Sequence, residues 1–234
     1  MGYAVVFSND HPGGDGLAML QPWASTSAAI DLGVGVLALD RHQPDGIAGH
    51  VDELGLPVSR LVLGLGAGWT STPLQVARTG VAALRAALPG ARVIVAAMGP
   101  KMCQLAGEVG DGALLNWMTP ERARWAVDLV HTGAAEAGRA PGSVTTYGYV
   151  RVAVGPDATE RLASEASMYQ QMPHYARNFE AAGTDPTKIG IAVAGGGELP
   201  DQLARYDAFD VTVVRVLSER DPEAVLEVAR AAKT

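Results

Sequence analysis

Short apolar runs alternate along this chain with longer stretches of helical periodicity, and this alternation restricts the fold more than any other feature. Near-continuous apolar strands, each followed by a helix, are typical of a parallel sheet that helices cover, with right-handed crossovers. The sequence therefore predicts an α/β fold. The predicted strands are Tyr3–Phe7, Leu32–Leu39, Arg60–Gly66, Arg92–Met98, Gly112–Met118, Tyr147–Val154 and Asp210–Val216, with Lys188–Gly195 as a candidate eighth.

The helical stretches carry recognisable start signals. Thr119 can cap a helix, and Glu121 then lies in its first turn, where an acidic side chain interacts favourably with the helix dipole. No low-complexity segment or linker-like change of composition interrupts the chain, so we expect residues 1–234 to form a single domain. The predicted helices are 73–88, 120–137, 157–182 and a last one after Asp221-Pro222.

Composition restricts the partners of this chain. Hydrophobic residues make up 48% of it and charged residues 18%, enough apolar material for one sizeable core. A net charge of -7 without a dense Lys/Arg cluster argues against a nucleic-acid surface and favours a small-molecule partner. The sequence shows no signal segment and no membrane-length apolar run, so we expect a cytoplasmic protein. The one cysteine, Cys103, cannot form an internal disulfide and is predicted to be an inert helix residue.

Two architectures suit so many strand–helix units: an open doubly wound sheet and a closed barrel of eight parallel strands. A dinucleotide-binding doubly wound sheet carries G-x-G-x-x-G directly after its first strand. The segment Ser8–Gly16, "SNDHPGGDG", lacks that spacing. In a barrel, by contrast, the small residues that recur at strand ends would all lie at the C-terminal mouth. The sequence therefore favours a TIM-type (β/α)8 barrel.

An ordered set of motifs supports the barrel. The succession "DHPG", "LGVGVLALDR", "RLVLGLGAGW" and "VIVAAMGPKMCQLAGEVGDGALLNWMTPE" resembles the bacterial luciferase-like flavin-dependent oxidoreductases and their deazaflavin-using relatives. The resemblance covers most of the chain to about residue 130 and continues less sharply to the end. It implies a barrel that binds FMN or the deazaflavin coenzyme F-420 (F420) at its C-terminal mouth. It also implies an oxidoreductase or monooxygenase that passes hydride to or from a small organic substrate, commonly as a homodimer.

The segment around Gly99-Pro100 is a candidate phosphate site. Gly99 lets the backbone approach a ligand closely, and Pro100 can begin a helix where its missing N–H costs nothing. The free N–H groups of a helix N-terminus attract anions, and the resemblance implies that the cofactor's phosphate lies here, beside Ala97 and Met98. The alternative is that Gly99-Pro100 only turns the chain.

Other strand ends are candidates for the ring pocket. The resemblance implies a cis peptide bond, not preceding proline, between Gly35 and Val36 behind the flavin. Glycine would ease the crowding there, although Gly35 can equally be an ordinary glycine in a tightly packed strand.

Two further strand ends carry small residues followed by an aromatic or polar side chain. Ala67 and Gly68 would allow the ring or ribityl chain to approach, and Trp69 could form a wall of the pocket. Trp69 can equally be a core or rim residue. Asn116 and Trp117 have the same two interpretations.

Asp10 and His11 form the candidate proton-transfer pair. They match the "DH" of deazaflavin-dependent relatives, and a histidine that titrates near neutrality can exchange a proton while hydride moves. Asp10 could orient His11, or it could cap a turn in a loop without catalytic function. No metal is expected, because the remaining histidines lack ligand spacing and are interpreted as surface or helix residues: His42, His50, His131 and His174.

Two departures from the family pattern bear on activity. In relatives, an opening strand and helix precede the segment that matches "GYAVVFSNDHPG", and a long substrate-covering segment follows the position of Trp69. We therefore expect a shortened barrel with an open pocket. A non-catalytic flavin-binding protein, similar to the shortened non-luminescent flavoproteins, is the alternative, and a barrel that has lost its cofactor is a third possibility.

Overall fold

The computed structural model describes residues 2–218 and 221–233. The chain divides into two compact units. The N-terminal unit contains Tyr3–Leu114 and Asp128–Thr146, and the C-terminal unit contains Leu115–Val127 and Tyr147–Thr234 together with the first two residues. Strands β5 and β6 lead the chain from one unit to the other, so each unit is described by itself.

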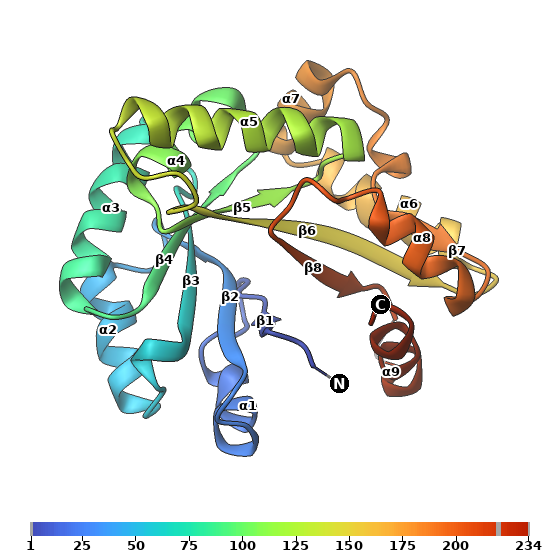
Figure 1. The fold of residues 1–234 in the computed structure, drawn as a ribbon, viewed down its shortest axis with the longest axis horizontal. Coiled ribbons are helices and arrows are strands. Elements are labelled where there is room, and N and C mark those ends of the chain that lie inside the picture. The colour runs from blue at the N-terminus through green and yellow to red at the C-terminus, as the bar shows by residue number, and fades with distance from the viewer. Residues whose placement is uncertain (1, 219–220, 234) are drawn as a thin grey trace. The chain divides into compact units, whose positions relative to one another are not determined.

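Parallel strands in chain order form the sheet of the N-terminal unit, shown in blue to green in Figure 1. In the parallel pairings of β1 with β2, β2 with β3, and β3 with β4, Val6 lies opposite Leu32 and Leu63 opposite Val93. The register between β2 and β3 shifts between Gly35 and Leu37. The strands are β1 (Val5–Ser8), β2 (Asp31–Ala38), β3 (Leu61–Gly66), β4 (Arg92–Ala97) and the start of β5 (Gly112–Asn116).

Helices cover this sheet on one side, where α2 and α3 pack together and α3 and α4 contact β4 (Figure 1). On α3, Ala77, Val81 and Leu84 are buried at helical spacing and supply the apolar face that holds it to the sheet. The helical segments are η1 (Ala18–Leu20), α1 (Gln21–Thr26), α2 (Pro44–Glu53), η2 (Val58–Arg60), α3 (Pro73–Ala87), α4 (Pro100–Val109) and α5 (Pro120–Glu136), the last of which begins in the C-terminal unit.

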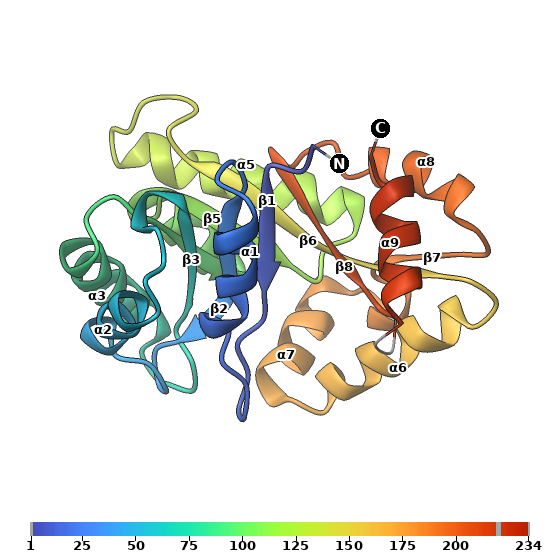
Figure 2. The ribbon, with the colours of Figure 1, turned by 90° about the horizontal axis from the view of Figure 1, so that it is seen from below.

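The C-terminal unit is built around the long strand β6 (Thr145–Val154), which pairs in parallel with both β7 (Ile191–Val193) and β8 (Val211–Val216). Figure 2 shows β6 and β8 running side by side. Strand β7 lies inside the candidate eighth strand, which is thereby confirmed. The helical segments are α6 (Ala158–Gln170), α7 (Pro173–Ala182), η3 (Pro186–Lys188), η4 (Gly196–Glu198), α8 (Leu199–Ala204) and α9 (Pro222–Ala231).

The prediction of one helix over 157–182 is wrong, because two helices, α6 and α7, occupy this stretch. Pro173 begins the second helix, and Met172 before it is extended, with φ -91° and ψ 117°. Proline has no N–H to donate and disfavours a helical conformation in the residue before it. The break therefore falls where the sequence contains its strongest helix terminator.

The other predicted helix starts are confirmed. The backbone N–H of Arg122 donates to the hydroxyl of Thr119 at 3.2 Å, and the N–H of Glu223 donates to Asp221 at 2.9 Å. Cys103 lies buried within α4, as expected. Among the described residues, no helix combines the length and the apolar character needed to cross a bilayer.

Close contact between α4 and α5 depends on two glycines and yields a prediction. A Cβ on Gly107 would overlap the carbonyl oxygen of Val130, and a Cβ on Gly133 would overlap that of Gln104. We expect Gly107→Ala to lower the free energy of unfolding by about 1–3 kcal/mol, because overpacking outweighs the gain in helix propensity.

The matched control is Gly49→Ala on α2, where an added Cβ meets nothing within 4 Å. This variant should gain about 0.4–1 kcal/mol. Urea unfolding of both variants measures the difference, and a stabilised Gly107→Ala protein would show that the two helices can separate without cost.

Candidate active site

The carboxyl ends of β1 to β4 lie at one edge of the sheet in the N-terminal unit, because these strands are parallel neighbours. The body of β3 is buried from Leu61 to Leu65, whereas accessible surface returns at the strand ends. The partly exposed residues there are Gly35, Val36, Gly66, Ala67, Met98 and Gly99. This edge therefore presents a floor of small and apolar residues, which is the kind of surface that a flat ligand can approach.

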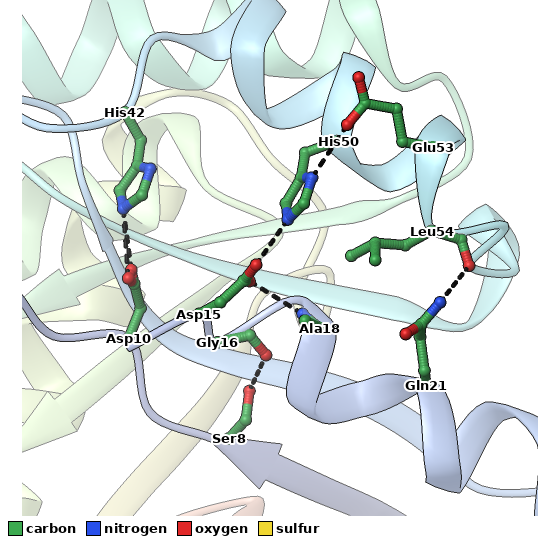
Figure 3. A network of polar contacts seen from close by, with 10 residues as sticks. All are labelled: Ser8, Asp10, Asp15, Gly16, Ala18, Gln21, His42, His50, Glu53 and Leu54. Atoms are coloured by element: carbon green, nitrogen blue, oxygen red, sulfur yellow. Dashed lines mark hydrogen bonds and ion pairs between the residues drawn. The ribbon is translucent and has the colours of Figure 1, made fainter. Parts of the chain in front are cut away.

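Asp10, which follows β1, has a buried carboxylate that is held by a histidine and an arginine side chain. Its side chain is only 1% exposed. His42 Nε2 lies 2.8 Å from one carboxylate oxygen and 3.2 Å from the other (Figure 3). Arg41 Nη1 lies 3.6 Å from the second of these oxygens. An ionised carboxylate at this depth needs such partners to offset the loss of hydration. Asp10 thus fixes the position of the His42 imidazole, which is about one-third exposed.

His11 lies differently from its predicted arrangement. Its side chain is exposed, its Nδ1 lies 3.1 Å from the carbonyl oxygen of Pro12, and its ring covers Gly14, where a Cβ would meet ring atoms at 2.7 Å. The imidazole that the structure brings to Asp10 belongs to His42, and the interpretation of His42 as a mere surface or helix residue is wrong. The signal was present in the sequence: His42 follows the second strand at its carboxyl end, as Asp10 follows the first.

The loop that carries Asp10 is anchored at its far end. His50 Nε2 on α2 lies 2.7 Å from an Asp15 oxygen, and the N–H of Ala18 donates to the other oxygen at 2.9 Å (Figure 3). The hydroxyl of Ser8 donates to the carbonyl of Gly16 at 2.6 Å. These contacts tie the loop to α2 and to β1, so the position of Asp10 does not depend on one bond.

Asp40 organises the end of β3. One of its oxygens accepts the backbone N–H of Trp69 at 2.9 Å. Gly68 has φ +68°, and a Cβ there would overlap the Asp40 carboxylate, so only glycine suits this position. The Trp69 side chain is 65% exposed, which places it at the rim and not in the core. It is available to a ligand that lies over this edge.

Both expectations for Gly35 are met. The peptide bond between Gly35 and Val36 is cis. A Cβ on Gly35 would lie 2.9 Å from Leu114 and 3.5 Å from Phe7, so the glycine is also tightly packed by the protein's own side chains. A larger residue at this position would have to displace Leu114.

The helix predicted after Gly99 is confirmed. Gly99 is the N-cap of α4 with φ -91° and ψ 161°, and Pro100 is the first residue of the helix. No acidic residue lies in the first turn, and the exposed Lys101 follows the proline. The free N–H groups and the lysine give this helix terminus a positive potential. Ala97, at the end of β4, is buried.

Asn116 and Trp117 belong to the C-terminal unit, where both contact the buried Arg151. The Nη1 of Arg151 donates to the side-chain oxygen of Asn116 at 2.8 Å. The guanidinium carbon of Arg151 lies 3.5 Å from the centre of the Trp117 ring. Sequence reasoning missed Arg151, because an arginine within an apolar strand gives no indication of what it contacts.

In the part of the chain that the structure describes, no group of three or more His, Cys, Asp or Glu side chains is placed to hold a metal ion.

The Asp15–His50 pair generates a pH prediction. The hydrogen bond with Asp15 raises the pKa of His50. Burial alone would raise the pKa of Asp15, but hydrogen bonds from Ala18 and His50 outweigh it and lower that pKa on balance. Stability from a raised histidine pKa is fully present below the unfolded value of about 6.5 and is lost as pH rises through the folded pKa.

We therefore expect His50→Gln to destabilise the protein at pH 5.5 and to approach wild-type stability at pH 9. Since both side chains are more than one-third exposed, the loss should be less than about 1 kcal/mol. Chemical unfolding at both pH values measures it. If the Asp15–His50 pair causes this loss of stability, His50→Gln should have no effect in a protein that already carries Asp15→Asn. The same loss in the Asp15→Asn background would show that another partner of His50 causes it.

Comparisons with known proteins place this geometry in a family. Residues 71–227 match the family of luciferase-like monooxygenases. The 5,10-methylenetetrahydromethanopterin reductase of Methanolobus tindarius is 29% identical over 259 residues, spanning 90% of this chain and 78% of that protein.

Two solved structures share the fold. An F420-dependent secondary alcohol dehydrogenase, in complex with an F420-acetone adduct, superposes with a TM-score of 0.79 and 17% identity, covering 100% of this chain and 91% of the other. The F420-dependent tetrahydromethanopterin reductase of Methanopyrus kandleri has a TM-score of 0.68 and 16% identity, covering 97% and 89%. The predicted class of fold, a luciferase-like TIM-type α/β barrel, is confirmed. The family match covers more than half of the sequence, and the chain belongs to the luciferase-like monooxygenase family.

Proposed function

We propose that this protein is an oxidoreductase that uses coenzyme F420, or alternatively FMN, to move a hydride to or from a small organic substrate. Membership of the luciferase-like family carries the proposal, supported by relatives whose names specify F420. F420 is the first choice because both of the solved relatives described above depend on it. We also propose a cytoplasmic homodimer, whose mass light scattering would measure.

The residues of the N-terminal unit fit such a cofactor. The N-terminus of α4, with Gly99, Pro100 and the exposed Lys101, suits a phosphate group. The partly exposed strand ends suit a flat ring, with the exposed Trp69 at the rim. When bound, the cofactor would supply a ring that accepts or releases hydride. The residues proposed to line this place are Gly35, Val36, Ala67, Gly68, Trp69, Ala97, Met98, Gly99 and Pro100.

Asp10 and the histidines are proposed to manage the proton that accompanies hydride movement. Asp10 is buried and contacts His42, so it acts as a positioning residue that orients the imidazole. His42 is partly exposed and can exchange a proton with substrate or solvent. His11, which is exposed in the same loop, is the second candidate for this role.

The phosphate site can be tested with Gly99→Asp. Aspartate is a good N-cap, so the fold should survive, while its carboxylate opposes a phosphate at the same helix terminus. We expect the affinity for F420 and for FMN to fall by about tenfold or more, which corresponds to about 1.4 kcal/mol. Absorbance titration of the purified protein measures both affinities.

Gly46→Asp on α2 is the matched control, because it adds the same charge where a Cβ meets nothing within 4 Å. Its affinity should equal that of the wild type. Equal affinities for all three proteins would remove the phosphate assignment, and a wild type that binds neither compound would remove the proposed cofactor.

Proton transfer can be tested by comparing His42→Ala with His11→Ala. If a histidine transfers a proton, its removal should lower kcat by about 10² to 10⁴ with little change in cofactor affinity. We expect the larger loss for His42→Ala, because Asp10 orients that ring. Steady-state rates on a substrate found by screening alcohols, aldehydes and imines provide the measurement.

His131→Ala, an exposed position on α5, is the control and should behave as wild type. A loss confined to His11→Ala would assign the proton transfer to His11. If the wild type binds cofactor but converts nothing across a broad panel, the non-catalytic flavin-binding alternative is favoured.

A further inference from the structure

The C-terminal unit buries a cluster of charged residues that lies outside the proposed cofactor site. Arg151 on β6 and Arg215 on β8 are direct partners in the parallel pairing of these strands. Like charges directly opposite each other destabilise a sheet. Glu165 on α6 bridges them, with one oxygen 3.2 Å from Arg151 Nε and 2.8 Å from Arg215 Nη1, and the other 3.2 Å from Arg215 Nη2.

Among the described residues, this cluster has one negative charge fewer than it has positive charges. Two guanidinium groups share a single carboxylate, and the remaining partner of Arg151, Asn116, is neutral. The side chain of Arg151 is 1% exposed, and that of Glu165 is 9% exposed. Burial lowers the pKa of Arg151, but a guanidinium remains protonated in proteins. The side chain of Arg215 is 26% exposed, so solvent partly screens its charge, whereas the Arg151 guanidinium is enclosed and is costly to bury unless an acceptor accompanies each of its donors.

Two hydrogen-bond donors of the cluster are buried and find no acceptor among the residues that the structure describes. They are Arg151 Nη2 and the indole Nε1 of Trp117, whose side chain is 2% exposed. The two groups are stacked, with the guanidinium carbon 3.5 Å from the centre of the Trp117 ring. Buried donors almost always have an acceptor, so two unpartnered donors in contact indicate a missing one.

The backbone at Trp117 supports a functional interpretation. Its φ is +55°, and Trp117 is the one non-glycine residue of the described chain with a positive φ. For a bulky residue this conformation costs on the order of 1–3 kcal/mol and is typical of ligand-binding sites. Tyr169 and Phe179 enclose the indole edge-on, with ring centres 4.9 and 5.3 Å away. The structure thus holds the indole in an unfavourable conformation against the guanidinium.

We propose that Arg151 Nη2 and Trp117 Nε1 form a binding site for the carboxylate of a small acidic ligand. A carboxylate supplies one negative charge and two acceptor oxygens, which match the missing charge and the two free donors. A water molecule would leave the charge uncompensated, and a phosphate dianion would overcompensate it. The site goes beyond the proposed redox function, because it consists of residues of the C-terminal unit and requires no cofactor.

Phe179 connects this site to the surface. It is one wall of a groove of about 530 Å³ beside α6 and α7, and its ring also contacts Trp117. Movement of this ring would open a path from the groove to the free donors. Glu180 and Asp185 line the same groove, so a carboxylate is repelled in the groove itself and is held only at Arg151.

The test is a titration of the cofactor-free full-length protein with sodium formate, acetate or benzoate at constant ionic strength, with sodium chloride and sodium phosphate as separate arms. Trp117 is the buried tryptophan, whereas Trp23, Trp69 and Trp125 are exposed, so protected tryptophan emission reports on the site. We expect a saturable change in emission and a rise in Tm with at least one carboxylate, and neither with chloride or phosphate.

Variants tie the signal to the two donors. Arg151→Gln should weaken carboxylate binding by about tenfold or more, the size expected for a lost charge-assisted hydrogen bond. Trp117→Phe keeps a ring but removes the indole donor, and it should weaken binding in the Tm assay. Trp125→Phe, beneath Arg122 on α5, is the matched control and should bind as wild type.

Three outcomes would overturn the proposal: no carboxylate effect beyond that of chloride, an effect of equal size in Arg151→Gln, or equal protection by phosphate. If Arg151→Gln does not fold, Arg151→Lys provides the same test, since it keeps the charge and loses the second arm of the fork. The carboxylate titration is independent of the F420 and FMN titrations, so a negative result in either experiment leaves the other proposal untouched.

Discussion

Parallel pairing of β1 to β4 is the constraint on which the candidate active site depends. It brings the carboxyl ends of four strands to one edge, so that residues separated by most of the N-terminal unit share a surface. Small residues then decide how close anything can approach that surface. Gly68 is required by its positive φ and by the Asp40 carboxylate beside it, whereas Gly35 is required by the packing of Leu114. The same edge is thus shaped partly by backbone conformation and partly by side-chain volume.

Buried charge sets the second constraint, and the two units treat it differently. In the N-terminal unit, the carboxylate of Asp10 is matched by His42 and Arg41. In the C-terminal unit, Glu165 is the one carboxylate of the described residues that pairs with Arg151 and Arg215. A buried charge that already has its partners mainly fixes the positions of those partners, as Asp10 fixes the His42 ring. A buried charge with unpartnered donors can still form hydrogen bonds with a ligand. The cluster around Arg151 therefore indicates a binding site.

Much of the fold could be predicted because its signals are local. Each apolar run became a strand, Thr119 caps a helix as predicted, and the last helix begins after Asp221, whose side chain caps it. The break at Pro173 is also a local signal, because proline disfavours a helical conformation in the residue before it, although one helix was predicted over 157–182. The site was less predictable, since its contacts join distant positions. Asp10 meets His42 across 32 residues, and Arg215 meets Glu165 across 50, separations at which sequence pattern carries no information on pairing.

The hydrogen bond between Asn116 and Arg151 bears on whether Asn116 is a structural residue or a cofactor contact. The side-chain oxygen of Asn116 already accepts from Arg151 Nη1, so it cannot be withdrawn without leaving a further buried donor unpartnered. The same bond orients the guanidinium that stacks on Trp117. Asn116 thus has a structural role in the charged cluster of its own unit, and its role as a cofactor contact stays a prediction. Its position at the end of a strand, which suggested a cofactor contact in the sequence, also brings it next to an arginine that the sequence alone could not place.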